Sequence, residues 1–141
     1  MLHFVSKVKE VGIGNCIVGI LKRERYKRLS KRYHFDSWHT SPYELRKYIQ
    51  AAAEYMNANH AEVVVDIGCG LGEMLHHINA KVKIGFDIHE EPIRAAKMLS
   101  KDNSTYYVGS FDEVNLQEPV DYLTALNFMH GSTEQTWISC F

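Results

Sequence analysis

The sequence has few cysteines, almost no net charge and no apolar stretch of membrane-spanning length. Cys16, Cys69 and Cys140 are an odd number without the spacing of a metal site, which argues against a disulfide framework and for a reducing compartment. The apolar segment at residues 11–21 has eleven residues, whereas a membrane span needs about 20. The first residues also lack the basic start and apolar run of a signal peptide. We therefore predict a cytoplasmic protein in which residues 11–21 are buried or interfacial.

The formal net charge is −1, and no nucleic-acid partner is expected. The charge is unevenly placed, because residues 1–33 carry nine Lys and Arg against two Glu, whereas residues 34–141 carry seven basic and fifteen acidic residues. A basic arm of this kind can meet an anionic surface, so weak contact with a membrane surface is one interpretation and a solvated leading helix is the other. We expect a basic helical extension over residues 1–40 and the core domain over residues 41–141.

Strand and helix patterns alternate after residue 40. Ser41 can cap a helix, Pro42 suits its first position and Glu44 completes a capping box, so a helix is predicted over residues 41–59. The valines at 63–65 suit a strand that is buried on both faces. The predicted strands are residues 62–67, 82–88, 105–109 and 121–126, and the helices between and after them are residues 71–78, residues 92–99 and a short one from residue 132. This alternation predicts an α/β fold with a Rossmann-like parallel sheet and flanking helices.

A glycine-rich turn follows the first predicted strand. Gly68, Gly70 and Gly72 alternate there, and glycine allows a positive φ and a close approach of a ligand to the backbone. Asp87 ends the next strand, nineteen residues after Gly68, where a carboxylate can accept hydrogen bonds from both hydroxyls of a ribose. This combination predicts a nucleoside-binding crevice at the carboxyl ends of the strands.

The acidic residues around the turn favour a cationic ligand. The dinucleotide fingerprint needs a glycine where this chain has Glu73, and a carboxylate in the first helical turn is a poor neighbour for a pyrophosphate. Asp66, at the end of the first strand, adds negative charge at the same place. A dinucleotide oxidoreductase is therefore a weaker hypothesis than a protein that binds a nucleoside with an ammonium and a sulfonium group.

Residues 63–72, VVVDIGCGLG, resemble the first motif of class I S-adenosylmethionine-dependent methyltransferases, and residues 85–89, GFDIH, resemble their second-strand motif. The resemblance covers roughly residues 60–130 and implies that the cofactor is S-adenosyl-L-methionine. It implies that Asp66 and the loop backbone hold the methionine end and that Asp87 binds the ribose. The cofactor-binding residues predicted in this way are Asp66, Gly68, Cys69, Gly70, Gly72, Asp87, Ile88, Ser110, Phe111, Asp112 and Asn127.

Within that set, Ile88 is expected against the adenine, and His89 is expected to edge the ribose pocket. Ser110 stands where the family often has an acidic residue for the adenine amino group, so the Ser110 hydroxyl, the Phe111 backbone or Asp112 could supply this contact. In the family, the segment after the fourth strand borders the transferred methyl group. The candidates for the reaction side are Asn127 and His130.

The sequence leaves several roles open. A general base is needed only if the acceptor carries a proton, and His34, His39 and His130 are equal candidates. The aromatic residues Tyr33, Phe35 and Trp38 form either a lid over the ligand or a packing layer against the sheet. Adjacent His76 and His77 face different directions on a helix, and no metal site is predicted.

The family fold usually has seven strands, and only four are predicted before Phe141, so the fold is expected to lack its C-terminal strands. The chain is then a shortened enzyme, completes its sheet with another copy as a homo-oligomer, or binds the cofactor without catalysis. The predicted function is a methyltransferase acting on a small-molecule or sugar- or lipid-linked acceptor. The alternative is a non-catalytic S-adenosylmethionine-binding or partner-binding module.

Overall fold

The described strands form one parallel sheet. The computed structural model describes residues 2–109 and 119–126. The strands are β1 (Val63–Ile67), β2 (Val82–Asp87), β3 (Ser104–Val108) and β4 (Tyr122–Thr124), in the spatial order β3-β2-β1-β4. All three pairings are parallel, so the strand order reverses between β1 and β4. The Rossmann-like parallel sheet predicted from the sequence is confirmed, and its switch point lies at the carboxyl end of β1.

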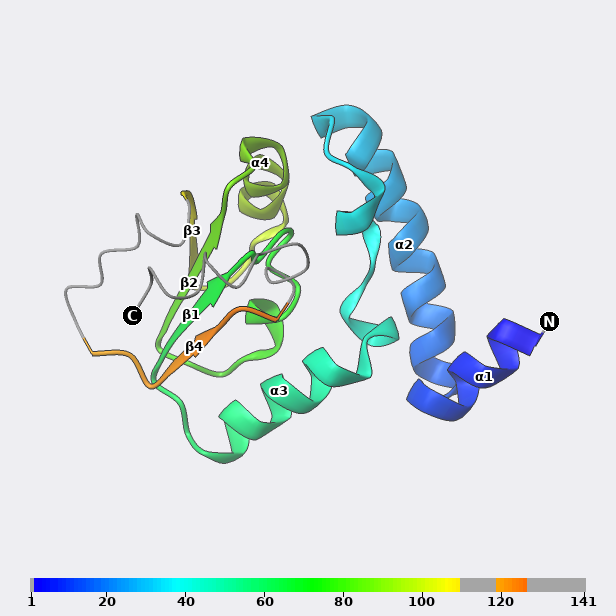
Figure 1. Ribbon diagram of the computed structural model, residues 1–141, viewed down its shortest axis with the longest axis horizontal. Helices are drawn as coiled ribbons and strands as arrows, with labels where there is room; N and C mark the ends of the chain where they lie inside the picture. The colour runs from blue at the N-terminus through cyan, green and yellow to red at the C-terminus, as the bar shows by residue number, and fades with distance from the viewer. Residues whose placement is uncertain (1, 110–118, 127–141) are drawn as a thin grey trace, which may run out of the picture.

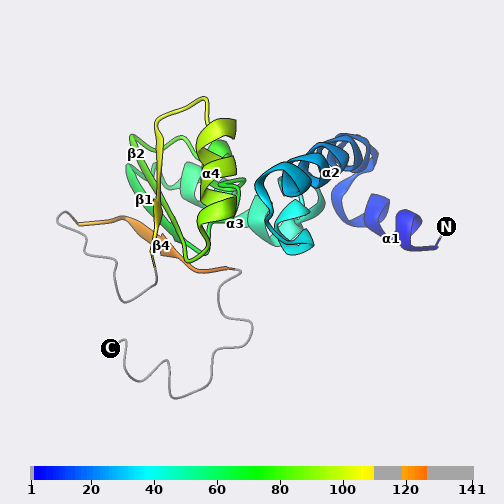
Figure 2. The same cartoon turned by 90° about the horizontal axis from the view of Figure 1, so that it is seen from above.

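The helices lie on one side of this sheet (Figures 1 and 2). The α-helices are α1 (Leu2–Val11), α2 (Ile13–Tyr33), α3 (Lys47–Ala58) and α4 (Glu90–Leu99), and the 3-10 turns are η1 (Ser37–Thr40), η2 (Tyr43–Leu45) and η3 (Leu75–His77). Helix α4 packs on β2 and β3, and α2 lies farther out, in contact with α4, η1 and η2. Within the described part of the chain, no helix is both long and apolar enough to cross a membrane.

Two apolar clusters hold these layers together. The larger one joins α3, the sheet and α4 through residues that are at most 2% exposed, among them Met56, Val64, Ile93 and Tyr106. The smaller one joins α2 to α4 and consists of Tyr26, Phe35, Leu71 and Ala95. Phe35 therefore packs the N-terminal helices onto the core, which is the second of the two roles considered for the aromatic residues.

The apolar segment at residues 11–21 is only partly buried. Cys16 and Gly19 are buried in the structure, whereas Ile17 and Leu21 are exposed. Gly19 is needed for close packing, because a Cβ there would lie 2.6 Å from the Leu45 side chain in η2. Helix α2 therefore buries one narrow stripe and leaves a second apolar stripe facing solvent.

The predicted start of the helix at Ser41 is wrong. Residues 43–45 form the 3-10 turn η2, and α3 begins at Lys47. Glu44 does not complete a capping box, because its carboxylate is largely buried and lies 2.5 Å from the Lys22 ammonium in α2. An ion pair with a distant helix therefore replaces the local capping interaction that the sequence suggested.

The helix predicted over residues 71–78 is also wrong, since only the turn η3 forms there. The apolar positions of that segment are nevertheless buried as their spacing indicated, including Leu71, Met74 and Leu75. Gly72 has a φ of 72°, which lies outside the right-handed helical region. The left-handed backbone of the glycine-rich turn therefore prevents a helix from starting before Met74.

Candidate functional site

The glycine-rich turn is tied to the next strand by backbone hydrogen bonds. The amides of Gly68 and Cys69 both donate to the Phe86 carbonyl, at 2.8 and 2.9 Å. Gly68 and Gly70 have φ values of 71° and 53°, which side chains rarely adopt. A Cβ at Gly70 would lie 2.9 Å from the His39 ring. The glycine thus allows the His39 ring of η1 to pack directly against the backbone of the turn.

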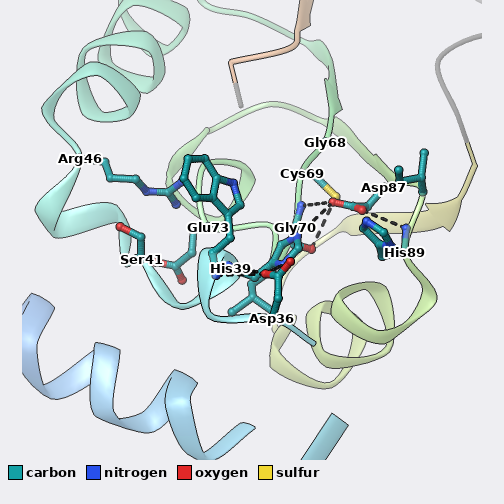
Figure 3. A pocket seen from close by; sticks show the side chains of 13 residues that line it. Asp36, His39, Ser41, Arg46, Gly68, Cys69, Gly70, Glu73, Asp87 and His89 are labelled. Atoms are coloured by element: carbon teal, nitrogen blue, oxygen red, sulfur yellow. Dashed lines mark hydrogen bonds and ion pairs between the residues drawn. The ribbon is translucent and has the colours of Figure 1, made fainter. Parts of the chain in front are cut away.

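Asp87 lies at the end of β2, directly across from this turn (Figure 3). Its Oδ2 accepts a hydrogen bond from the Gly70 amide at 3.0 Å, and its Oδ1 accepts one from the His89 amide at 3.0 Å. Asp87 is 5% exposed. Burial alone would raise the pKa of its carboxyl, but His39 and the two amides lower it below the usual range. Asp87 is therefore held as a carboxylate at the edge of the crevice.

His39 stands between two carboxylates. Asp36 caps η1 by accepting from the Trp38 amide, and its Oδ1 lies 2.8 Å from His39 Nδ1. On the other side, His39 Nε2 lies 3.7 Å from Asp87 Oδ2. Burial lowers the pKa of His39, but the two carboxylates outweigh it and raise the pKa above its usual value. His39 thus links η1 to Asp87 at the end of β2, and Figure 3 shows the three side chains together.

Glu73 joins the turn to the N-terminal helices. Its carboxylate is 5% exposed and accepts hydrogen bonds from the Tyr26 hydroxyl in α2 and, at 2.8 Å, from the Tyr43 amide in η2. Burial and the neighbouring Glu73 charge raise the pKa of Tyr26, which keeps the phenol a donor. The negative charge that the sequence placed in this turn is therefore buried and fixed by two donors.

Asp66 and Cys69 lie deeper, at the carboxyl end of β1. Asp66 accepts a hydrogen bond from the Thr124 hydroxyl at 2.8 Å, but burial dominates and raises the pKa of its carboxyl to about 7. Burial also raises the pKa of the Cys69 thiol well above its usual value, so this cysteine is unsuited to act as a nucleophile. The Cys69 thiol is therefore uncharged near neutral pH, whereas Asp66 is divided between its neutral and its charged form.

A cavity opens between the turn, η1 and the end of β2 (Figure 3). Five of the cofactor-binding residues predicted from the sequence line it, and the expected neighbour His89 lines it too. The five are Gly68, Cys69, Gly70, Asp87 and Ile88. Asp66 lies behind the lining, and a Cβ at Gly72 would collide with the Tyr106 hydroxyl rather than fill the cavity. The remaining predicted site residues, Ser110, Phe111, Asp112, Asn127 and His130, lie outside the described residues.

The cavity also contains residues outside the predicted cofactor-binding set, although Glu73 was expected beside the ligand, Trp38 was a candidate for a lid and His39 was a candidate base. These are Asp36, Trp38, His39, Ser41, Arg46, Leu71 and Glu73. Among them Arg46 has a buried Nε without a hydrogen-bond partner in the described part of the chain. Of the candidate bases, His39 lines the cavity whereas His34 is the exposed C-cap of α2. The dense run of aromatic and polar residues at 33–46 was the sequence signal for these cavity residues. No local pattern in the sequence connected that run to the glycine-rich turn.

No protein-family model matches the chain, and none of the curated proteins matches it. Solved structures do resemble it. One is the amino pentose methyltransferase CalS10 from Micromonospora echinaspora, which is involved in calicheamicin biosynthesis and was solved with S-adenosylmethionine bound. CalS10 is 20% identical to this chain, and the match has a TM-score of 0.50 and covers 72% of this chain and 41% of CalS10. Another is the magnesium protoporphyrin IX methyltransferase ChlM from Synechocystis PCC 6803, solved with S-adenosylhomocysteine; it is 16% identical, with a TM-score of 0.51 over 79% of this chain and 57% of ChlM.

The chain thus spans about half the length of these two enzymes. At such low identity the likeness establishes the fold alone. Together with the order β3-β2-β1-β4 and the turn after β1, it shows that the described residues adopt a Rossmann-like fold of the class I methyltransferase type.

Proposed function

We propose that this chain binds S-adenosylmethionine and belongs to a methyltransferase. The observation that carries the proposal is the pairing of the Gly70 amide with the buried Asp87 carboxylate at 3.0 Å, at the carboxyl ends of β1 and β2 and next to the point where strand order reverses. The expected cofactor is also the ligand with which the two similar enzymes named above were solved, as S-adenosylmethionine or S-adenosylhomocysteine.

The residues around the cavity fit this cofactor. Gly70 allows the His39 ring, which lines the cavity, to pack directly against the backbone of the turn. Asp87 is a carboxylate suited to accept from the two ribose hydroxyls, and the exposed Ile88 beside it offers an apolar surface for the adenine. The acidic lining suits the positive charges of the sulfonium and ammonium groups, whereas Glu73 disfavours a pyrophosphate.

Arg46 is the candidate for the carboxylate of the methionine end. It lines the cavity, and its Nε is a buried donor without a partner among the described residues. A guanidinium binds a carboxylate in a planar, two-point geometry, so one ligand group would satisfy the donor that the protein leaves unmet. Asp66, near Arg46 behind the turn, would favour the adjacent ammonium group.

When bound, S-adenosylmethionine supplies an activated methyl group, so the protein must mainly orient the acceptor and exclude water. His39 is the histidine placed to move a proton in the described cavity, with Asp36 fixing its Nδ1. Asn127 and His130 remain the proposed residues of the reaction side, and Ser110, Phe111 and Asp112 remain those of the adenine contact. We propose a small-molecule or a sugar- or lipid-linked acceptor; the amino pentose substrate class of CalS10 supports the sugar.

Calorimetric titration with S-adenosylhomocysteine tests the cofactor assignment. The wild-type chain should bind, Asp87→Ala should weaken binding roughly a hundredfold because two hydrogen bonds to a charged acceptor are lost, and NAD should not bind. Glu90→Gln is the matched control, since Glu90 is an exposed acid three residues away at the start of α4. Absence of binding in the wild type, or equal binding by D87A, would refute the assignment.

Methyl transfer needs a separate assay. Labelled S-adenosylmethionine should pass its methyl group to one of a panel of small molecules and of sugar- and lipid-linked acceptors, and D87A should lose this activity. Tight binding of S-adenosylhomocysteine without transfer to any acceptor would instead favour the non-catalytic binding module.

A further inference from the structure

The solvent face of α2 is divided along its length into an apolar half and a cationic half. Its first half presents Ile13, Ile17, Ile20 and Leu21, which are 46–68% exposed. Its second half continues the same stripe, at spacings of three and four residues, with the residues Glu24, Lys27, Arg28 and Lys31, which are all exposed. We call this stripe the outer face of α2. In both views α2 lies farther from the sheet than α4 does, and α1 lies beside α2, farther out still (Figures 1 and 2).

The residues of the outer face are exposed in the described part of the chain, although α1 also contacts α2. The opposite side of α2 is fixed by Cys16, Gly19 and Tyr26, which are buried against the rest of the fold. The face from residue 13 to residue 31 extends for about 27 Å at the usual rise of 1.5 Å per residue. Exposed aliphatic residues gathered on one helix mark an interaction surface rather than ordinary scatter.

The cationic half contains a hollow. It is lined by Glu24, Lys27, Arg28, Ser30 and Lys31 of α2 and by Ser37 and Thr40 of η1, and the Thr40 hydroxyl already donates to the Ser37 carbonyl. Lys27 is paired with Glu24 at 2.6 Å, whereas Arg28 and Lys31 form no ion pair with any described residue. Because Lys27 is neutralised by Glu24, which lines the same hollow, Arg28 and Lys31 are the cations there that a phosphate oxygen would meet.

We propose that the outer face of α2 docks on an anionic lipid membrane. The aliphatic half would enter the boundary between headgroups and acyl chains, and the cationic half would hold lipid phosphates, with the hollow as the site of one headgroup. Charge complementarity sets the orientation, because residues 1–33 are strongly basic whereas the rest of the chain is acidic and is repelled by the same surface. The large residues on the apolar half are aliphatic rather than aromatic, which disfavours a single-stranded nucleic acid that would stack on rings.

Docking would bring the cavity close to the bilayer, because the turn η1 contributes to both hollows. Ser37 and Thr40 line the hollow on α2, whereas Trp38 and His39, which lie between them in the chain, line the cavity. A lipid-linked acceptor would then reach the cavity from the membrane. The docking itself does not depend on methyl transfer.

Vesicle co-sedimentation of the full chain tests the proposal. The wild type should bind vesicles containing phosphatidylglycerol at low salt, bind vesicles of phosphatidylcholine alone far less, and dissociate in about 1 M salt, where the Debye length is about 3 Å. Arg28→Gln with Lys31→Gln, and separately Ile17→Ser with Leu21→Ser, should each reduce binding to the anionic vesicles roughly tenfold. All four residues are exposed, so the circular dichroism and the unfolding midpoint of these variants should match those of the wild type.

Lys97→Gln with Lys101→Gln is the matched control for charge, because both lysines are exposed at the end of α4 and after it; this variant should bind as the wild type does. The proposal is overturned if this control loses as much binding as the α2 variants, or if vesicles of both compositions bind equally weakly. Sedimentation equilibrium tests the rival occupant: a dimer that disappears in I17S/L21S, without vesicle binding, would assign the face to a second copy and overturn the proposal.

Discussion

The glycine-rich turn and the outer face of α2 hold their charges in opposite ways. Asp66, Glu73 and Asp87 are 5–6% exposed, and each accepts at least one hydrogen bond, whereas Arg28 and Lys31 are exposed. A buried charge is tolerated only when the fold supplies its partners, so its geometry is set before any ligand arrives. An exposed charge can adapt to whatever approaches it. The comparison separates a preorganised site from an adaptable surface.

Two glycine substitutions should give the largest contrast between these regions. Gly72→Ala should lower the free energy of unfolding by about 2–4 kcal/mol, because the methyl group meets the Tyr106 hydroxyl and the residue must keep a positive φ. Gly14→Ala in α2 meets nothing within 4 Å and should stabilise the chain by about 0.5–1 kcal/mol, since alanine is the better helix former. Urea unfolding measures both, and a similar loss in the two variants would contradict this contrast.

Removal of one carboxylate from each region should have unequal effects. Glu73→Ala leaves the Tyr26 hydroxyl and the Tyr43 amide without their acceptor, which should reduce the free energy of unfolding by about 1–3 kcal/mol. Glu24→Ala removes an exposed ion pair with Lys27 and should leave the unfolding midpoint unchanged. If both variants unfold at the wild-type midpoint, the Glu73 contacts do not stabilise the fold.

The pH dependence of stability should report the buried acid Asp66. Its pKa is about 7 in the fold and near 4 when unfolded. Between these values the folded state therefore binds more protons, and stability falls as the pH rises from about 4 to about 7. Asp66→Asn should remove this part of the fall, which is up to about 1.4 kcal/mol per pH unit. Glu24→Gln is the control on α2, and a wild-type slope that persists in D66N would assign the fall to another group.

The smallest expected effect concerns His39 and rests on the proposed cofactor. Asp36, Asp87 and the ring of His89 face His39, and the two carboxylates raise the pKa of His39. The imidazolium ion competes with ribose hydroxyls for Asp87, so affinity for S-adenosylhomocysteine should rise a few-fold as the pH is raised past the usual histidine range and His39 loses its proton. His39→Gln should flatten this rise in calorimetric titrations. Equal slopes would refute the competition, whereas no binding at any pH would refute the cofactor assignment instead.

Local patterns predicted most of the sheet because they needed no distant partner. The valines at 63–65, the alternating glycines and Asp87 lie within short segments, and the structure places β1, the turn and β2 where these segments predicted them. The helix starts at residues 41 and 71 were wrong because Glu44 pairs with Lys22 and the turn holds positive φ values. The start of the first helix is thus decided by a contact between distant segments, and the start of the second by the backbone conformation of the turn.

The same distinction applies to the cavity. Gly68, Gly70 and Asp87 could be expected at one edge of the sheet from their spacing after two strands. Asp36 and Arg46 could not, because their place beside the turn depends on how η1 and η2 pack against α2. Their roles, and those of the predicted residues, remain predictions until binding is measured.

The four consecutive residues of η1 form part of the walls of two separate hollows, the cavity and the hollow on α2. This shared wall can couple binding in one hollow to binding in the other. A small rotation of this turn changes the shape of both. If a molecule in one hollow selects a particular orientation of η1, it alters the affinity of the other hollow, and reciprocity requires the second molecule to alter the first affinity by the same factor. Binding in the hollow on α2 and binding in the cavity beside the glycine-rich turn would then be linked equilibria.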